Sequence, residues 1–387
     1  MTSMSRIVAA EDAVPAQAGA RGAPRAAAVV RDLREALPTL SDEWTALALR
    51  AAEPNPFAEL WFVSAALASL PETVRPQLLE VRRADRLIGL LPVVPERGYA
   101  RLPVHFTANW QHDQMFLGTP LVAAGEEAAF WRAALATLDD APGAGNFLHL
   151  RGLAEQGPVY RALVATRACG IAYHEVRAFL QSSLGPQAYY EQAVRPKKRK
   201  ELRRQRNRLA ELGDLAFRRL ENAADLAGWC DAYLALEKAG WKGEAGSAFA
   251  CLPAKEAFFR AALKGAHDAG RLQFLRLDVG GRPVAMLVNF RCPPGSFSFK
   301  TVFDGSFARF SPGVLIQIEN LDILDDPAIA WMDSCAAEDH PMIDSLWAER
   351  RAIVRVTVPL KGVSRFTTYA ACRALERSAA ALRKLRA

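Results

Sequence analysis

The residues best suited to chemistry lie in the segment SFSFKTVFDGSFARFSPGVLIQIENL, where an alternating strand pattern ends at Asp304 and a short loop follows. Ser311 and Pro312 are typical of the N-cap and the first position of a helix. Gly313 would let a ligand approach the backbone closely, and Arg309 adds positive charge just before the helix. Because a helix N-terminus presents free N–H groups, this segment could hold a pyrophosphate. Ser-Pro-Gly is equally compatible with a plain helix start.

Two further candidates follow that segment. Asp333 lies in the predicted strand AIAWMDSCA among apolar neighbours, where burying a carboxylate is costly unless it is paired or functional. His340, just before Pro341, could act as a base or could begin a helix. Each residue alone is more often structural, but both come directly after the possible anion site, which favours a functional role.

A third cluster lies in LEKAGWKGEAGSAFA. Glu237 and Trp241 are four residues apart, so both can project from one face at the end of a helix. Lys242 and the glycines after it then form a flexible, polar loop. Such a loop beside a carboxylate suits the binding of an acceptor, although a glycine-rich helix end with a packing tryptophan would look the same.

Several catalytic signatures are absent from the sequence. It contains no P-loop, no GxGxxG after a strand, no GxSxG elbow and no HExxH. The six cysteines are scattered without CxxC pairing, and no metal-ligand cluster is present. These absences argue against hydrolases, dehydrogenases and metalloenzymes, and the cysteine usage predicts a cytoplasmic protein.

The elements that must position these residues alternate between helix and strand patterns. LEVRRADRLIGLLPVV and FLRLDVGGRPVAMLVNF each contain an apolar strand, a two-residue turn, an arginine (Arg86 or Arg282) and a second apolar strand. Two helices precede each hairpin, and further strand and then helix follow it. Antiparallel hairpins exclude a doubly wound parallel sheet. We therefore predict an α/β fold with a mixed (α+β) sheet, built from two copies of one unit.

This repeat predicts how the 387-residue chain is divided. Residues 1–27 are rich in Ala, Gly, Pro and Arg and lack an apolar run, which is typical of a disordered leader. Residues 28–185 and 186–387 are predicted to form the first and the second unit. No apolar run approaches the ~20 residues of a membrane-spanning helix, and the sequence leaves the oligomeric state open.

The stretch RPKKRKELRRQRNRL, residues 195–209, carries nine Lys and Arg residues against one Glu, while the whole chain carries a net charge of +7. Pro196 suits the first position of a helix whose apolar stripe is thin. The stretch could bind nucleic acid, lie on a membrane, recruit a small anionic partner, or simply be solvated. The absence of aromatic residues weighs against base stacking, and the thin stripe weighs against membrane insertion.

Over residues 186–350 in particular, the sequence resembles a known group of acetyltransferases. LEKAGWKGEAGSA, FKTVFDGSFARFSPGVLIQIENL and MDSCAAEDHPMIDSLWAERR, preceded by KKRKELRRQRNRLAELGDLAF, look like the cellulose-biosynthesis-associated acetyltransferases of the GNAT superfamily. The resemblance covers roughly residues 30–370. It implies two tandem GNAT-like domains, a degenerate N-terminal one and a C-terminal acyltransferase domain. Fem-type aminoacyl transferases, which take aminoacyl groups from tRNA, share this architecture.

The resemblance implies direct acyl transfer from a thioester, with acetyl-CoA as the expected donor and no metal, to an amine or hydroxyl of a saccharide or polysaccharide precursor. The alternative is a tRNA-dependent aminoacyl transferase, or a nucleic-acid-binding protein that uses residues 195–209. The resemblance places the CoA pyrophosphate at the helix start, with the cofactor-binding residues Arg309, Phe310, Ser311, Gly313, Val314 and Leu315. Here RFSPGV replaces the usual glycine-rich loop and offers fewer free amides.

The resemblance also implies roles for the remaining candidates. A backbone N–H of the strand 296–304 would polarise the thioester carbonyl while a base removes the acceptor's proton. The candidate catalytic residues are Asp304, Glu237, Asp333 and His340, in order of preference as base, and Lys300, which alternation places on the same side of its strand as Asp304. An ion pair between Lys300 and Asp304 is the structural alternative. The candidates for acceptor contact are Trp241, Lys242 and Trp347, since aromatic faces suit sugar rings.

Overall fold

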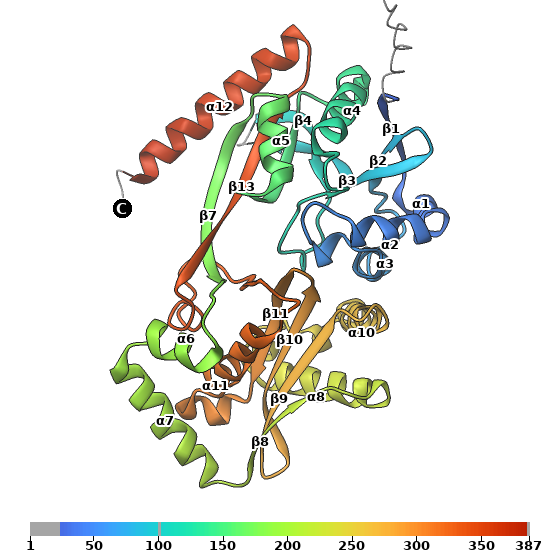
Figure 1. The fold of residues 1–387 in the computed structure, drawn as a ribbon. Helices are drawn as coiled ribbons and strands as arrows, with labels where there is room; N and C mark the ends of the chain where they lie inside the picture. The colour runs from blue at the N-terminus through green and yellow to red at the C-terminus, as the bar shows by residue number, and fades with distance from the viewer. Residues whose placement is uncertain (1–23, 100–101, 385–387) are drawn as a thin grey trace, which may run out of the picture.

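The computed structural model describes residues 24–99 and 102–384, and within them thirteen strands form one mixed sheet (Figure 1). The first part of the chain supplies β1 (Ala26–Asp32), α1 (Leu33–Thr39), α2 (Ser41–Leu49), η1 (Pro56–Ala58), α3 (Leu60–Ala68), β2 (Gln77–Arg83), β3 (Arg86–Tyr99), β4 (Leu102–Asn109), β5 (Leu121–Val122), α4 (Glu127–Asp140), η2 (Pro142–Ala144), β6 (Phe147–Ala154) and α5 (Pro158–Thr166). We call these elements the first unit.

The second unit repeats this succession. It contains α6 (Pro186–Ala193), α7 (Pro196–Ala210), β8 (Leu215–Arg219), η3 (Ala223–Asp225), α8 (Leu226–Ala239), α9 (Trp241–Glu244), η4 (Phe249–Cys251), α10 (Pro253–Asp268), β9 (Leu272–Val279), β10 (Arg282–Cys292), β11 (Gly295–Phe303), η5 (Gly305–Phe310), α11 (Pro312–Glu319), η6 (Asn320–Asp325) and β12 (Trp331–Asp333). Two long strands, β7 (Gly170–Leu180) and β13 (Glu349–Pro359), join the units, and α12 (Val363–Lys384) ends the described chain.

The sheet order shows that the two units have the same topology. β1 to β4 and β8 to β11 are antiparallel runs, and each is followed by a parallel pair, β4 with β6 and β11 with β12. The connecting strands are exchanged: β13 inserts between β6 and β7, while β7 pairs with β12. Figure 1 shows β7 and β13 running side by side between the two units. This topology confirms the predicted α/β fold with two copies of one unit. A domain boundary near residue 185 stays a prediction.

The two predicted hairpins form as expected. β2 and β3 are joined at Ala84–Asp85, and β9 and β10 are joined at Gly280–Gly281, where both glycines have positive φ. Arg86 pairs with Glu126, and Arg282 pairs with Asp304. The two matching arginines therefore each bind a carboxylate of their own unit, which strengthens the internal repeat.

Three details differ from the prediction. β1 begins at Ala26, so the last residues of the expected leader belong to a strand, while residues 1–23 lie outside the described part. The strand expected in AIAWMDSCA is reduced to the three residues of β12. It ends there because the chain turns away after Asp333, and Cys335 adopts a left-handed backbone conformation with φ 51°. The helix α12 was not predicted.

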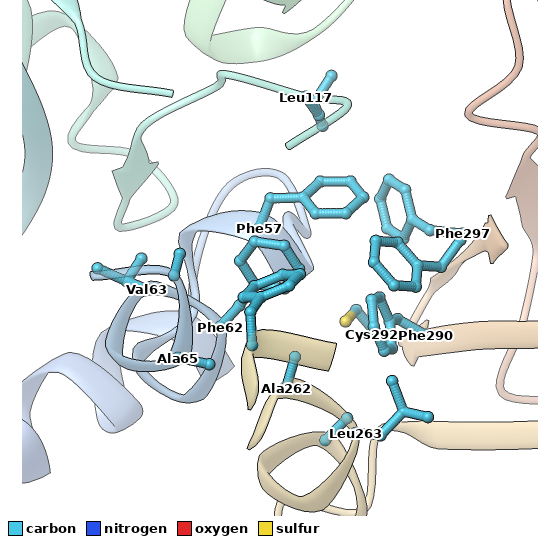
Figure 2. Packing of buried hydrophobic residues seen from close by; sticks show 14 of the residues in the cluster. Phe57, Phe62, Val63, Ala65, Leu117, Ala262, Leu263, Phe290, Cys292 and Phe297 are labelled. Carbon is cyan, nitrogen blue, oxygen red and sulfur yellow. The ribbon is translucent and has the colours of Figure 1, made fainter. Parts of the chain in front are cut away.

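A cluster of phenylalanines packs the two units against each other (Figure 2). Phe57 and Phe62, around the start of α3, face Phe290 of β10 and Phe297 of β11, with ring centroids 6.0–6.4 Å apart across the junction. All four rings are at most 1% exposed. Because separating the units would expose these rings to water, the hydrophobic effect holds the junction together.

A buried ion network lies where β7, β12 and β13 meet. The carboxylate of Asp333 is fully buried and binds Arg177 of β7 at 2.7 and 2.8 Å and Arg351 of β13 at 2.9 Å. It also accepts the N–H of Cys335 at 2.9 Å. Burial by itself would raise the pKa of Asp333, but the two guanidinium groups outweigh it and hold the pKa below its usual range.

We expect Asp333→Asn to lower the free energy of unfolding by about 3–5 kcal/mol, because the change leaves buried guanidinium groups without a counter-charge. Urea unfolding of the purified protein measures this loss. Asp268→Asn is the matched control, since Asp268 forms an exposed pair with Lys264 on one face of α10, and it should barely move the unfolding midpoint. Equal, small effects of the two substitutions would contradict a structural role for the network.

Candidate active site

The candidate active site lies where β11 and β12 diverge. The two parallel strands pair over residues 295–297 and 331–333, after which β11 continues without β12 beside it. A β-bulge follows directly in β11: Val288 of β10 is opposite Lys300 and Asn289 is opposite Ser298, so Phe299 is the extra residue. A bulge leaves its extra residue out of the hydrogen-bond ladder. The hydrogen-bond ladder between β10 and β11 is therefore interrupted at Phe299, next to the point where β11 and β12 diverge.

Lys300 follows this bulge and is surrounded by aromatic rings. Its Nζ lies 4.8 Å from the ring centroid of Phe116, 5.5 Å from that of Phe299 and 5.7 Å from that of Phe249. Burial lowers the pKa of Lys300 to about 8; the charge of Lys242 acts in the same direction, and that of Glu237 opposes it. A lysine with this pKa is partly neutral near physiological pH, so it can accept a proton.

The end of α8 places an ion pair beside Lys300. The buried Glu237 accepts hydrogen bonds from Lys242 Nζ at 2.9 Å and from the backbone N–H of Phe249 at 2.8 Å. This pair fixes the loop that presents the Phe249 ring to Lys300. The structure therefore brings together three of the predicted site residues, Lys300, Glu237 and Lys242. The side chain of Trp241 lies outside the described part.

The first unit contributes the wall opposite α8. Arg177 donates a hydrogen bond to the carbonyl oxygen of Phe116 at 2.9 Å while it also binds Asp333. The Phe116 ring, which contacts Lys300, is thus held in place by the ion network between the units. Beside it opens a cavity of about 290 Å³ whose lining includes Phe116, Cys335, Tyr173, Glu175 and Arg355. The site is therefore built from both units.

Asp304, the preferred base from the sequence, lies away from this cluster. Its carboxylate caps η5 by accepting from Ser306 N at 2.9 Å and Ser306 Oγ at 2.7 Å, and it also pairs with Arg282. Burial would raise the pKa of Asp304, but these hydrogen bonds and Arg282 hold it below its usual range. The predicted ion pair with Lys300 is wrong, because Arg282 takes the carboxylate and Lys300 faces aromatic rings.

Asp333 and Trp347 occupy structural positions. The carboxylate of Asp333 is enclosed by two guanidinium groups, so it is a poor proton acceptor. The ring of Trp347 is 1% exposed and packs in a core that includes Tyr189 and Ile343, which contradicts the predicted contact with an acceptor. His340 is half-buried on the segment after β12, where its carbonyl accepts from Asp344 N at 3.0 Å. Its ring Nδ1 is buried and has no hydrogen-bond partner within the described chain.

The start of α11, where the sequence predicts a pyrophosphate-binding site, has a different backbone structure from the one expected. Ser311 occupies the N-cap position, but it is left-handed (φ 55°, ψ 47°) and its side chain caps no N–H. The N–H groups of Val314 and Leu315 both donate to the carbonyl of Ser311, at 2.9 and 3.0 Å, and Pro312 has no N–H. These three residues therefore offer no free amide to a phosphate.

The other residues of the predicted pyrophosphate-binding site also pack against neighbouring side chains. Gly313 is buried, and a Cβ there would lie 3.1 Å from the Phe303 ring and 3.3 Å from Met342 Sδ. The guanidinium of Arg309 lies 4.6 Å from the ring centroid of Phe310. Close packing of α11 against β11 therefore explains this glycine better than the approach of a ligand does.

The predicted basic helix forms as α7 and lies beside this region (Figure 1). Its thin apolar stripe, Leu202 and Leu209, is buried, and Gln205 Nε2 donates to the carbonyl of Arg309 at 3.3 Å. Cationic side chains of α7 therefore stand next to a helix start that has few free amides.

Sequence reasoning missed the residues that build the surroundings of Lys300. Phe116, Arg177 and Cys335 are far from Lys300 in sequence, and only the fold brings them together. One local signal was available, since a lone lysine in the apolar strand FSFKTVF is unusual and deserved a higher rank. In residues 24–99 and 102–384, no grouping of His, Cys, Asp and Glu suits a metal ion, and no helix has the length and apolarity to cross a membrane.

Comparison with known proteins gives the chemistry of the second unit. Residues 196–344 match a family model described as "Acetyltransferase (GNAT) domain", and this match runs from the start of α7 past β12. No curated protein matches the chain.

Solved structures share the fold. The crystal structure of FemX has a TM-score of 0.52 at 10% identity and covers 82% of this chain and 96% of its own. The C-terminal domain (DUF2156) of a putative lysylphosphatidylglycerol synthetase from Agrobacterium fabrum has a TM-score of 0.53 at 12% identity, covering 85% of this chain and 94% of its own. A tandem GNAT protein from the clavulanic acid biosynthesis pathway is more distant, with a TM-score of 0.43 at 15% identity and coverage of 87% and 99%.

At these identities the first two likenesses concern the fold, whereas the domain match concerns the activity. Together with the repeated topology, they confirm the predicted α/β architecture of two units with one topology, of which the second matches the GNAT domain model. The second unit carries a GNAT acetyltransferase domain over residues 196–344, and the chain is an acyltransferase.

Proposed function

We propose that this protein transfers an acyl group, acetyl in the simplest case, from acyl-CoA to an amine or hydroxyl of a saccharide or polysaccharide precursor. The observation that carries the proposal is Lys300, a lysine with its pKa lowered to about 8, placed beside the bulge where β11 and β12 diverge. The GNAT domain match covers this strand and supports a thioester donor.

The residues around the point where β11 and β12 diverge have different roles in the proposed reaction. CoA supplies an activated thioester and a good thiolate leaving group. Neutral Lys300 accepts the proton that the acceptor loses as it attacks the acyl carbonyl. A backbone N–H at the bulge around Phe299 donates to the carbonyl oxygen as negative charge develops there. Lys242, held by Glu237, favours the neutral form of Lys300 through its like charge.

The cavity at the junction of the units supports a small polar acceptor. Its volume of about 290 Å³ is near the lower end of ligand pockets, which suits one sugar-sized group. Tyr173 and Phe116 provide aromatic surface, while Glu175 and Arg355 provide polar partners. Phe116 lines this cavity and its ring also contacts Lys300, which connects the cavity to the lysine. We also place the protein in the cytoplasm, because all six cysteines are free.

An assay of the purified protein tests this function directly. The protein is incubated with acetyl-CoA and a panel of amino sugars and oligosaccharides, and both free thiol and acetylated product are measured. We expect thiol release that depends on the acceptor, with acetyl found on that acceptor by mass spectrometry. Thiol release that is the same without any acceptor, or no release across the panel, would contradict the proposal.

We expect Lys300→Met to lower kcat/KM by about 10²–10⁴-fold, the usual contribution of a general base. Lys300→Arg should not restore activity, because a guanidinium group keeps its proton at all accessible pH values. In the wild type, kcat/KM should rise as the pH passes through about 8, since Lys300 must be neutral. Lys264→Met, on the exposed face of α10, is the matched control. An active Lys300→Met enzyme with an unchanged pH profile would refute the assignment.

Two neighbouring substitutions should shift that pH profile in opposite directions. Glu237→Gln removes a charge that raises the pKa of Lys300, so the rise in kcat/KM should move to lower pH. Lys242→Gln removes a charge that lowers this pKa, so the rise should move to higher pH. Circular dichroism confirms that both variants are folded. Shifts of the same sign would mean that the titrating base is a different group.

A further inference from the structure

A large cavity of about 690 Å³ lies between α6, α7, β8 and α11, outside the site around Lys300. Figure 1 shows α7 running beside α11 at the end of the molecule away from the first unit. The cavity is open to solvent along α7, whose outer residues are mostly exposed. Its size is within the range of sites for nucleotide-sized ligands.

The α7 side of this groove is strongly basic. Arg199, Lys200, Arg203 and Arg206, which follow one another along the helix at spacings of one to three, all line it. Within the described chain, no carboxylate lies within ion-pairing distance of Lys200 or Arg203, whereas on the same helix Arg204 is paired with Glu201 at 2.8 Å. Arg199 donates to the carbonyl of Val194 at 3.1 Å, which fixes its position. Arg206 lies over the Phe217 ring at 5.5 Å, so within the described residues Lys200 and Arg203 face the cavity without a carboxylate partner beside two positioned arginines.

The opposite side of the groove has a different chemistry. Glu319 and Asp322, at the end of α11 and in η6, line it together with the apolar side chains of Leu315 and Ile318. Burial, and then the like charge of the other acid, raises the pKa of Glu319. Phe217 of β8 adds an aromatic surface to the groove. Carboxylates and an aromatic ring suit the hydroxyl and amino groups of a nucleoside, while the basic side suits its phosphates.

The groove is within reach of the reacting centre. Leu315 and Ile318 face the groove, and Gln317 on the other side of the same helix donates to Thr301 Oγ1 of β11 at 3.1 Å. The groove and β11 are therefore separated by the width of one α-helix, about 10 Å. The pantetheine arm of CoA is longer than this separation, so a nucleotide end held in the groove leaves the arm enough length to pass around α11 towards β11.

We infer that this groove binds the phosphate-bearing nucleotide end of the acyl donor. Side chains of α7 thereby add phosphate donors to a helix start with few free amides, since Pro312 has no N–H and Val314 and Leu315 donate to Ser311. The inference rests on the proposed function, in which the donor is acyl-CoA. It assigns Lys200 and Arg203 as the principal partners of the phosphates, with Arg206 beside them.

Calorimetry with CoA and with dephospho-CoA, which lacks the 3′-phosphate, tests the inference. The test variant is Lys200→Gln/Arg203→Gln. The matched control is Lys198→Gln/Arg208→Gln, which removes the same two residue types from exposed positions of α7 that do not line the groove. We expect the test variant to raise the Kd for CoA about tenfold or more, as expected for lost charge-assisted hydrogen bonds, and the control to change it little. Wild type should prefer CoA over dephospho-CoA, and the test variant should lose this preference.

The possible outcomes separate the inference from the proposed function. If CoA binds the wild type and the groove variant equally well, the groove assignment is wrong while the proposed donor stands. If groove and control variants lose affinity equally, the helix acts through its overall field and the groove assignment also fails. If wild type binds no CoA at millimolar concentration, the proposed donor fails. If it then retains tRNA in a way that depends on Lys200 and Arg203, α7 serves a nucleic acid and the inference is overturned.

Discussion

Asp333 is a fully buried carboxylate at the junction of the two units. It binds Arg177 from β7 and Arg351 from β13, which are the two strands that the units exchange. Arg177 also holds the carbonyl of Phe116, and the Phe116 ring is one of the three that surround Lys300. Burying the Asp333 charge is costly unless both arginines are in place. The contact therefore fixes how β7 and β13 are aligned at the junction. Through Arg177, the same contact sets the environment of the candidate catalytic lysine.

The surroundings of Lys300 combine stabilising and destabilising contributions. The phenylalanine rings between the units supply apolar burial, and Figure 2 shows how closely they approach one another. Those next to Lys300 also exclude water from its ammonium group, which disfavours the charged form. Cation–π attraction between the ammonium group and the ring faces offsets part of this destabilisation. The balance leaves a lysine that can change its protonation state near neutral pH, and such strained sites are typical of function rather than of stability.

The sequence predicted the architecture well because the hairpins carry strong local signals. Each has apolar alternation, a two-residue turn and an arginine at the same position, so the repeat could be recognised without tertiary information. The exchange of β7 and β13 could not be predicted, because it depends on pairing between residues about 180 positions apart. The length of β12 was overestimated, since apolar composition does not reveal that the chain turns away after Asp333.

The site was predicted less well than the fold. Glu237 and Lys242 were found because they lie close together in sequence at a helix end, and the structure joins them. Asp304 and Asp333 were ranked too high as bases, because their arginine partners come from other strands and leave no local trace. The start of α11 was misjudged in a similar way. Ser-Pro-Gly does begin a helix, but whether its amides are free depends on the hydrogen bonds of Val314 and Leu315 to Ser311.

In the proposed reaction, Lys300 exchanges a proton near neutral pH at the junction of the two units. An NMR titration of the side-chain ε-carbons in protein labelled with ¹³C-lysine measures this directly, with the Lys300 signal assigned by its absence in Lys300→Arg. We expect this signal to titrate with a pKa of about 8, well below those of exposed lysines. A Lys300 signal that titrates together with the exposed lysines, above pH 10, would show that Lys300 stays charged at neutral pH and is not the base.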